Sequence, residues 1–230
     1  MGTDDDDDDL CAQPSWYNGF NSPYYTASHA AFREKVRAFV EREIAPHAHE
    51  WDEAKTIPRE VYRATYEAGI LPAIVGKPWP SDLVPECAPP ENFDYFHELI
   101  VFDEFARCGS GGVLWGLLEG INIGLPPVLN FGSDALRRRV GVPCLRGDGI
   151  ICLCITEPYA GSDVANIRCE AKLDSSGQFY HVTGEKKWIT NGIWADYFTV
   201  AVRTGGPGMG GISLLVVERT MPGVECRRMD

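Results

Sequence analysis

The segment 153–163, which reads LCITEPYAGSD, places small polar groups where an apolar run opens into a loop. Thr156 and Ser162 can each donate a hydroxyl hydrogen bond, and Gly161 permits close approach of a ligand to the backbone. Such a loop could hold a flat polar ring system and an anion. A turn whose polar side chains satisfy their own backbone explains the same composition, and the segment alone favours that simpler interpretation.

The segment 186–192, KKWITNG, offers a second set of groups suited to a planar ligand. Trp188 supplies a large flat surface, and Thr190 supplies a hydroxyl donor at the end of a predicted strand. A core tryptophan beside a turn accounts for this segment equally well. Neither segment by itself therefore identifies a site.

The elements that must position these groups change in character near residue 148. Before that point apolar residues recur at helical spacing, and Pro46 ends the first helix. The spacing predicts helices over 32–44, 58–69, 93–109, 111–124 and 133–140. After residue 149 the period becomes two, and turn residues separate the runs. The alternation predicts strands over 150–156, 167–173, 179–182, 187–190, 197–202, 212–218 and 224–229.

The predicted fold class is therefore α+β, with an all-helical domain over 26–148 followed by a small β-sandwich or barrel over 149–230. Residues 1–25 are predicted to form a disordered acidic tail, because residues 4–9 are six consecutive aspartates with no apolar partner. The last predicted strand reaches the end of the chain and leaves an uncovered sheet edge. We therefore expect the β-domain to be cut short.

Composition excludes several classes of function. The net charge is −12, and the only dense basic cluster is the arginine run 137–139, so a nucleic-acid partner is not expected. Unbroken apolar runs reach only strand length, so no membrane span is expected. The eight cysteines form no metal-binding spacing, and His47 and His49 cannot share a helix face, so no metal site is predicted. Buried thiols without a signal peptide favour the cytoplasm, with the mitochondrial matrix as the alternative.

Taken together, the motifs ITEPYAGSD at 155–163 and GEKKWITNG at 184–192 resemble the acyl-CoA dehydrogenase family of flavoproteins. The resemblance spans roughly residues 30–230 and includes the order of a helical domain followed by a β-domain. Tyr159 departs from the pattern, because glycine is common at that position. The family has a further C-terminal helical bundle, so the resemblance implies that this chain is a fragment.

The resemblance implies an oxidoreductase that holds FAD and acts on an acyl-CoA thioester of fatty acid metabolism. Thr156 would bond the pyrimidine side of the flavin, Trp188 would flank the ring, and Thr190 would donate toward its N5 edge. Ser162 matches the residue that contacts the acyl-CoA. The implied cofactor-binding residues are Leu153, Cys154, Ile155, Thr156, Gly161, Ser162, Trp188, Ile189 and Thr190.

The family reaction removes a proton beside the thioester carbonyl and transfers a hydride from the next carbon to the flavin. Its base is a glutamate of the C-terminal bundle, so no catalytic residue is assigned here and the isolated chain is expected to be inactive. Glu157 is interpreted as structural. The electron acceptor would be a flavoprotein or oxygen, and the complete protein would be a homo-oligomer. The alternatives are a related flavin oxidase, acting on an acyl-CoA or a nitroalkane, and a non-catalytic binding remnant.

Overall fold

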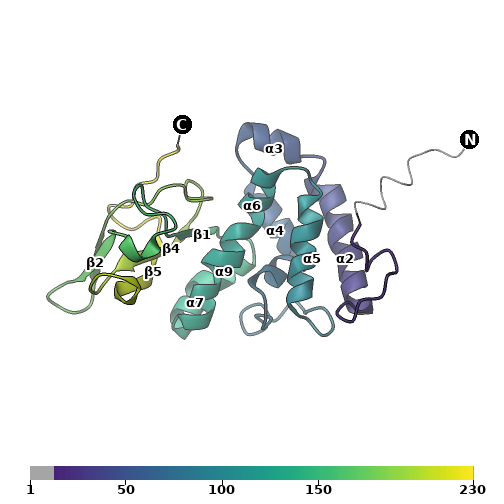
Figure 1. The fold of residues 1–230 in the computed structure, drawn as a ribbon, viewed down its shortest axis with the longest axis horizontal. Coiled ribbons are helices and arrows are strands. Elements are labelled where there is room, and N and C mark those ends of the chain that lie inside the picture. The colour runs from purple at the N-terminus through teal and green to yellow at the C-terminus, as the bar shows by residue number, and fades with distance from the viewer. Residues whose placement is uncertain (1–12, 230) are drawn as a thin grey trace, which may run out of the picture.

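The computed structural model describes residues 13–229, with helices in the first part of the chain and one sheet in the second. Figure 1 shows the helices packed together on one side and the sheet on the other. The α-helices are α2 (Ala27–Phe39), α3 (Ala48–Ala54), α4 (Arg59–Glu67), α5 (Tyr95–Ala106), α6 (Gly111–Glu119), α7 (Pro126–Phe131), α8 (Asp134–Leu136) and α9 (Val142–Leu145). Short π-helical turns at Val40–Ile44, Gly120–Gly124 and Arg137–Gly141 continue α2, α6 and α8. The predicted helical class of this part is confirmed.

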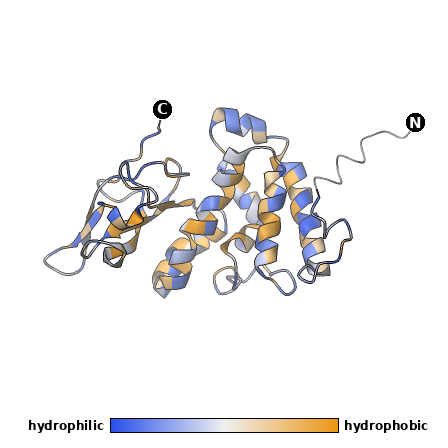
Figure 2. Cartoon of the chain, viewed as in Figure 1, coloured by the Kyte–Doolittle hydropathy of each residue, from blue (hydrophilic) through white to orange (hydrophobic). Residues whose placement is uncertain are grey.

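Local sequence signals explain where these helices begin and which face they bury. The apolar stripe that starts at Phe32 and ends at Ile44 is buried along its whole length. Ser133 caps α8, because its hydroxyl accepts a hydrogen bond from Leu136 N. α3 was not predicted, because its seven residues are mostly polar and carry no apolar stripe. Figure 2 shows this contrast between hydrophilic α3 and hydrophobic α5.

The sheet has five strands in the described residues and is mixed. They are β1 (Ile151–Cys154), β2 (Glu170–Leu173), β3 (Tyr180–Thr183), β4 (Tyr197–Arg203) and β5 (Ile212–Glu218). β4 is central: β1 runs parallel along one edge with Ile151 opposite Tyr197, and β5 runs antiparallel along the other. β2 joins β4 at a single pair and forms an antiparallel hairpin with β3. The predicted order of a helical part followed by a small sheet is confirmed.

Two of the predicted strands are wrong. Residues 187–190 form no strand, because Trp188 has a positive φ of 59°, which a strand does not accommodate. Residues 224–229 also form no strand. Instead, Arg228 donates to the backbone carbonyl of Lys55 at 2.9 Å, so this segment turns toward the helices.

The sheet packs closely against the end of α6. A Cβ added to Gly120 would lie 1.9 Å from the carbonyl oxygen of Ile151, so the helix and β1 can touch only through glycine. Thr199, buried in β4, donates its hydroxyl to Gly124 O at 2.6 Å. The sheet is therefore positioned by direct backbone contact with the helical part.

One helical stretch of the described chain, Gly111–Phe131, is long and apolar enough to cross a membrane by length and composition alone. Glu119 and Asn122 interrupt the apolar residues of this stretch, so it is not one of the unbroken apolar runs on which the prediction of no membrane span was based. Half of the most apolar part of this stretch is buried inside the protein, as in a core helix.

The predicted disordered tail covers residues 1–25, and its aspartate run lies outside the described residues. Residues 13–25 differ from a solvated tail. Trp16 stacks on Tyr25 with ring centroids 4.0 Å apart, and Arg37 donates to Gln13 Oε1 at 2.6 Å. These aromatic rings supply the apolar surface that the aspartate run lacks, and the segment packs beside α2.

Candidate functional site

The two motif segments lie side by side. Lys187 N donates to Thr156 O at 2.9 Å, and Lys186 Nζ donates to Ile155 O at 2.8 Å. The first segment leaves the end of β1, and the second precedes the turn that leads into β4. The structure thus brings together residues that the sequence separates by about thirty positions.

Glu157 anchors this contact. Its carboxylate is fully buried, and it accepts from Lys186 Nζ (2.8 Å), Arg168 N (2.6 Å) and Cys169 N (2.9 Å). Burial alone would raise the pKa of Glu157, but the bonds from Lys186 and the two amides outweigh burial and hold the pKa below its usual value. Glu157 therefore remains ionised and has the structural role that its place in the motif predicts.

Three hydroxyl groups of the predicted site have no hydrogen-bond partner within the described residues. Thr156, Ser162 and Thr190 make no side-chain hydrogen bond within residues 13–229, and none of these side chains is fully buried. A Cβ added to Gly161 would meet nothing within 4 Å, so space beside this backbone is open. Free donors and an open glycine are the features that a polar ring system such as a flavin requires, so these residues fit the implied cofactor.

Trp188 presents its ring to solvent. Its side chain is 56% exposed, although it is large and apolar. The Lys187 ammonium lies 4.7 Å from the centroid of this ring. An exposed indole of this kind provides a stacking surface for a planar ligand. The neighbouring Ile189 packs partly against the core and fixes the backbone behind it.

Two of the remaining predicted residues, Leu153 and Cys154, lie within β1. Cys154 is buried and Leu153 is half-buried, and both pair with β4. The Sγ atoms of Cys152 and Cys154 are 3.6 Å apart on one face of β1, and both cysteines are free thiols. The seven cysteines of the described chain are all free, which confirms the prediction of thiols for that part.

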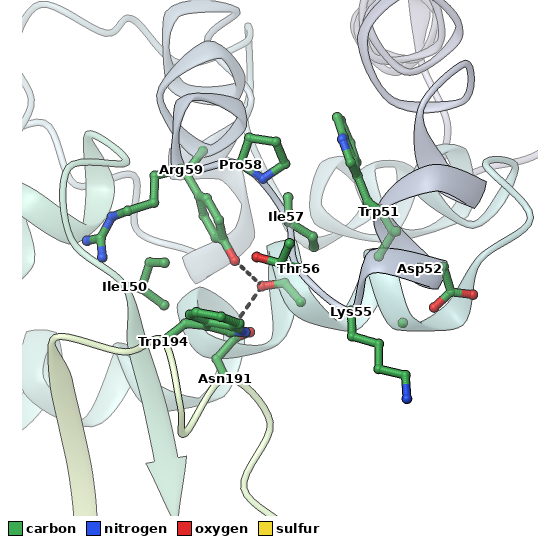
Figure 3. A pocket seen from close by; sticks show the side chains of 14 residues that line it. Trp51, Asp52, Lys55, Thr56, Ile57, Pro58, Arg59, Ile150, Asn191 and Trp194 are labelled. Carbon is green, nitrogen blue, oxygen red and sulfur yellow. Dashed lines mark hydrogen bonds between the residues drawn. The ribbon is translucent and has the colours of Figure 1, made fainter. Parts of the chain in front are cut away.

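A cavity of about 430 Å³ lies between the helices and the turn after Thr190 (Figure 3). Its volume falls within the range of small-molecule sites. The residues that shape it include Trp51, Thr56, Ile57, Tyr62, Asn191 and Trp194. The predicted cofactor residues do not line it, although Asn191 directly follows Thr190.

The wall of this cavity is fixed by the carbonyl of Gly116 in α6. This oxygen accepts from the hydroxyl of Tyr62 at 2.8 Å and from Asn191 Nδ2 at 2.7 Å. Burial raises the pKa of Tyr62, which keeps its hydroxyl protonated as a donor. Sequence reasoning missed the cavity because its walls come from segments far apart in the chain.

The structure also groups His29, Asp94 and His97, whose ligand atoms lie within 4.8 Å of one another. Their hydrogen bonds explain the group without a metal ion. Thr26 N donates to His29 Nδ1 at 2.9 Å, so Nε2 carries the proton and donates to Asp94 Oδ1 at 2.9 Å. Both ring nitrogens of His29 are therefore engaged in hydrogen bonds, and neither keeps a free lone pair for a metal ion. The group therefore joins the capped N-termini of α2 and α5.

Comparison with known families agrees with this geometry. The family model described as the acyl-CoA dehydrogenase N-terminal domain matches residues 26–148. The model described as the acyl-CoA dehydrogenase middle domain matches residues 152–230. The two matches follow the order of the helical part and the sheet.

Individual relatives are similar over most of this chain. The chain is 42% identical over 226 residues to the acyl-CoA dehydrogenase apdG of Emericella nidulans, which covers 95% of this chain and 52% of that protein. The structure of a probable acyl-CoA dehydrogenase from Mycobacterium abscessus has a TM-score of 0.79 at 40% identity, covering 89% of this chain and 52% of that one. An acyl-CoA dehydrogenase from Bacillus anthracis, complexed with FAD, shares the fold with a TM-score of 0.73 at 23% identity, covering 93% of this chain and 35% of that one. The chain spans about half the length of the first two.

Proposed function

The chain belongs to the acyl-CoA dehydrogenase family, and on this premise we propose that it holds FAD for the α,β-dehydrogenation of an acyl-CoA thioester. The observation that carries the proposal is the hydrogen bond from Lys187 N to Thr156 O. This bond joins two segments that present an exposed tryptophan and three hydroxyls without a side-chain hydrogen bond in the described part of the chain. When bound, FAD would supply the acceptor for the hydride.

Each residue of the two segments would have a separate task. Thr156 and Thr190 would donate hydrogen bonds to the polar edges of the ring, and Trp188 would cover the ring and exclude water. Ser162 would bond the acyl-CoA. Glu157 would move no proton, because its carboxylate is fully buried and already accepts three hydrogen bonds.

The proposal is tested by titrating the 230-residue chain with FAD and following flavin fluorescence. We expect Trp188→Ala to raise the dissociation constant of FAD about tenfold, because a stacked aromatic surface is lost. Thr190→Val removes one donor at nearly constant volume, and we expect it to weaken binding about fivefold.

The matched control is Trp115→Ala on α6, because Trp115 is 53% exposed and Trp188 is 56% exposed. We expect this control to bind FAD as tightly as the unmodified chain. Two results would contradict the proposal: no binding of FAD by the unmodified chain up to about 1 mM, or equal affinities of the Trp188→Ala and Trp115→Ala variants.

A further inference from the structure

Tyr159, the residue that departs from the family pattern, is held at the tip of a tight turn. Glu157 N donates to Ala160 O at 3.0 Å, and Ala160 N donates back to Glu157 O at 3.1 Å. Ala160 is buried beneath the turn, whereas the Tyr159 side chain is 52% exposed. The aromatic ring is therefore presented to solvent from a fixed backbone.

The guanidinium of Arg168 lies over this ring, 4.2 Å from its centroid. The backbone amide of Arg168 donates to Glu157 Oε2 at 2.6 Å. The same buried residue thus fixes both the turn that carries Tyr159 and the segment that carries Arg168. Within the described residues Arg168 forms no ion pair, so its charge is not neutralised by a carboxylate.

Arg168 also lines an open cavity of about 480 Å³ between residues 165–168 and the glycine-rich loop at 205–207. A second guanidinium, that of Arg203, belongs to the same wall and donates to backbone carbonyls that include Ala165 O (2.7 Å) and Gly206 O (2.6 Å). The lining residues include no aspartate or glutamate. Asp163, the acid of the adjoining loop, accepts a hydrogen bond from Asn166 and is not part of the lining. The cavity is therefore suited to an anion.

We propose that Arg168, oriented by Tyr159, binds the diphosphate group of the coenzyme A part of the substrate. The planar guanidinium can donate two parallel hydrogen bonds to phosphate oxygens, and stacking on the ring holds it in one orientation. Tyr159 lies three residues before Ser162, whose hydroxyl is free in the described chain. The assignment to coenzyme A rests on the proposed function, whereas the preference for a diphosphate rests on the Arg168 guanidinium, which forms no ion pair within the described residues, and on the cavity that Arg168 lines.

The site is tested first with inorganic diphosphate, by isothermal titration calorimetry of the 230-residue chain. Arg168→Ala removes the guanidinium and keeps the backbone amide that Glu157 holds. We expect this variant to bind diphosphate about tenfold more weakly than the unmodified chain. The affinity of the Arg168→Lys variant should lie between those of the unmodified chain and Arg168→Ala. Arg138→Ala is the matched control, because Arg138 is an exposed arginine on the helical part with no ion pair in the described chain. Equal binding by the unmodified chain and the Arg168→Ala variant overturns the proposal.

Coenzyme A and FAD are then titrated separately against the same variants. A tenfold loss for coenzyme A with unchanged affinity for FAD supports the assignment. A loss for FAD alone overturns it, because the diphosphate would then be that of the flavin cofactor. If coenzyme A binds the unmodified chain and the Arg168→Ala variant with equal affinity, this inference fails and the proposed function stands. If only inorganic diphosphate binds and depends on Arg168, the anion site stands and the coenzyme A assignment fails together with the proposed function.

Discussion

Replacing Glu157 with glutamine tests whether the buried ion pair holds the two motif segments together. The carboxylate accepts three hydrogen bonds, from Lys186 Nζ and from the amides of Arg168 and Cys169. A glutamine in the same place has one acceptor oxygen, and its NH₂ group would face at least one of these donors. The variant Glu157→Gln thus leaves a buried amide without an acceptor, at about 1–3 kcal/mol, and an ammonium without its counter-charge. We expect the free energy of unfolding to fall by about 3–5 kcal/mol in total, the range for breaking a buried pair.

Urea unfolding at pH 7 measures this loss, and a double-mutant cycle with Lys186→Met isolates the pairwise part. Removing both charges leaves no uncompensated ion, so we expect the double variant to be more stable than the sum of the single losses predicts, by about 2 kcal/mol. A loss below about 0.5 kcal/mol for Glu157→Gln would refute the reasoning, since that is the usual effect of a surface substitution.

The pH dependence of the same comparison provides a second check. The pKa of Glu157 is lowered in the folded protein, so its contribution to stability is fully present above the usual pKa of the carboxyl group, 4.5. The contribution is lost as the pH falls through the lowered value. The difference in stability between the unmodified chain and Glu157→Gln should therefore shrink below pH 4.5. A difference that is constant down to acid pH would show that the charge of Glu157 contributes nothing.

Two further predictions concern the framework around the site. Gly120→Ala would place a Cβ 1.9 Å from Ile151 O. We expect this variant to lower the unfolding free energy, measured by urea titration, by more than about 3 kcal/mol. A loss under about 1 kcal/mol would contradict the close contact between helix and sheet. Burial lowers the pKa of His97 and outweighs the hydrogen bond with Asp94, which raises it, so the stability that depends on neutral His97 should decline as the pH falls below 6.5 toward the lowered pKa. His97→Asn should flatten this part of the profile of unfolding midpoint against pH, and an unchanged slope in the variant would assign the pH dependence to other groups.

Much of the site could be recognised in the sequence because motif residues act through their chemical type. The hydroxyls of Thr156 and Thr190 and the indole of Trp188 were chosen as donors and as a stacking surface, and the structure places their two segments in contact. Their roles toward FAD remain proposals. The helical stripe from Phe32 onward and the strands β2 and β3 were also visible, since a repeat of 3.6 or 2 residues is a local property of the chain.

The conformation at Trp188 shows where local reasoning stops. A run of Trp, Ile and Thr favours a strand, yet Trp188 has a φ of 59° and residues 187–190 form no strand. Contacts with distant segments of the chain override this preference. Among them are the hydrogen bond from Lys187 N to Thr156 O and that from Asn191 Nδ2 to Gly116 O. The cost of a left-handed residue is about 1–3 kcal/mol, which several tertiary contacts can offset.

The sequence by itself determined the order of a helical part and a sheet, and the residue types of the two motifs. The tertiary structure alone decided that Glu157 pairs with Lys186, that Arg168 lies over Tyr159, and that a cavity opens beside Asn191. The physical reason is the range of the interactions. Periodicity and capping depend on neighbours within a few positions, whereas burial, ion pairing and cavities depend on which distant segments the fold brings into contact.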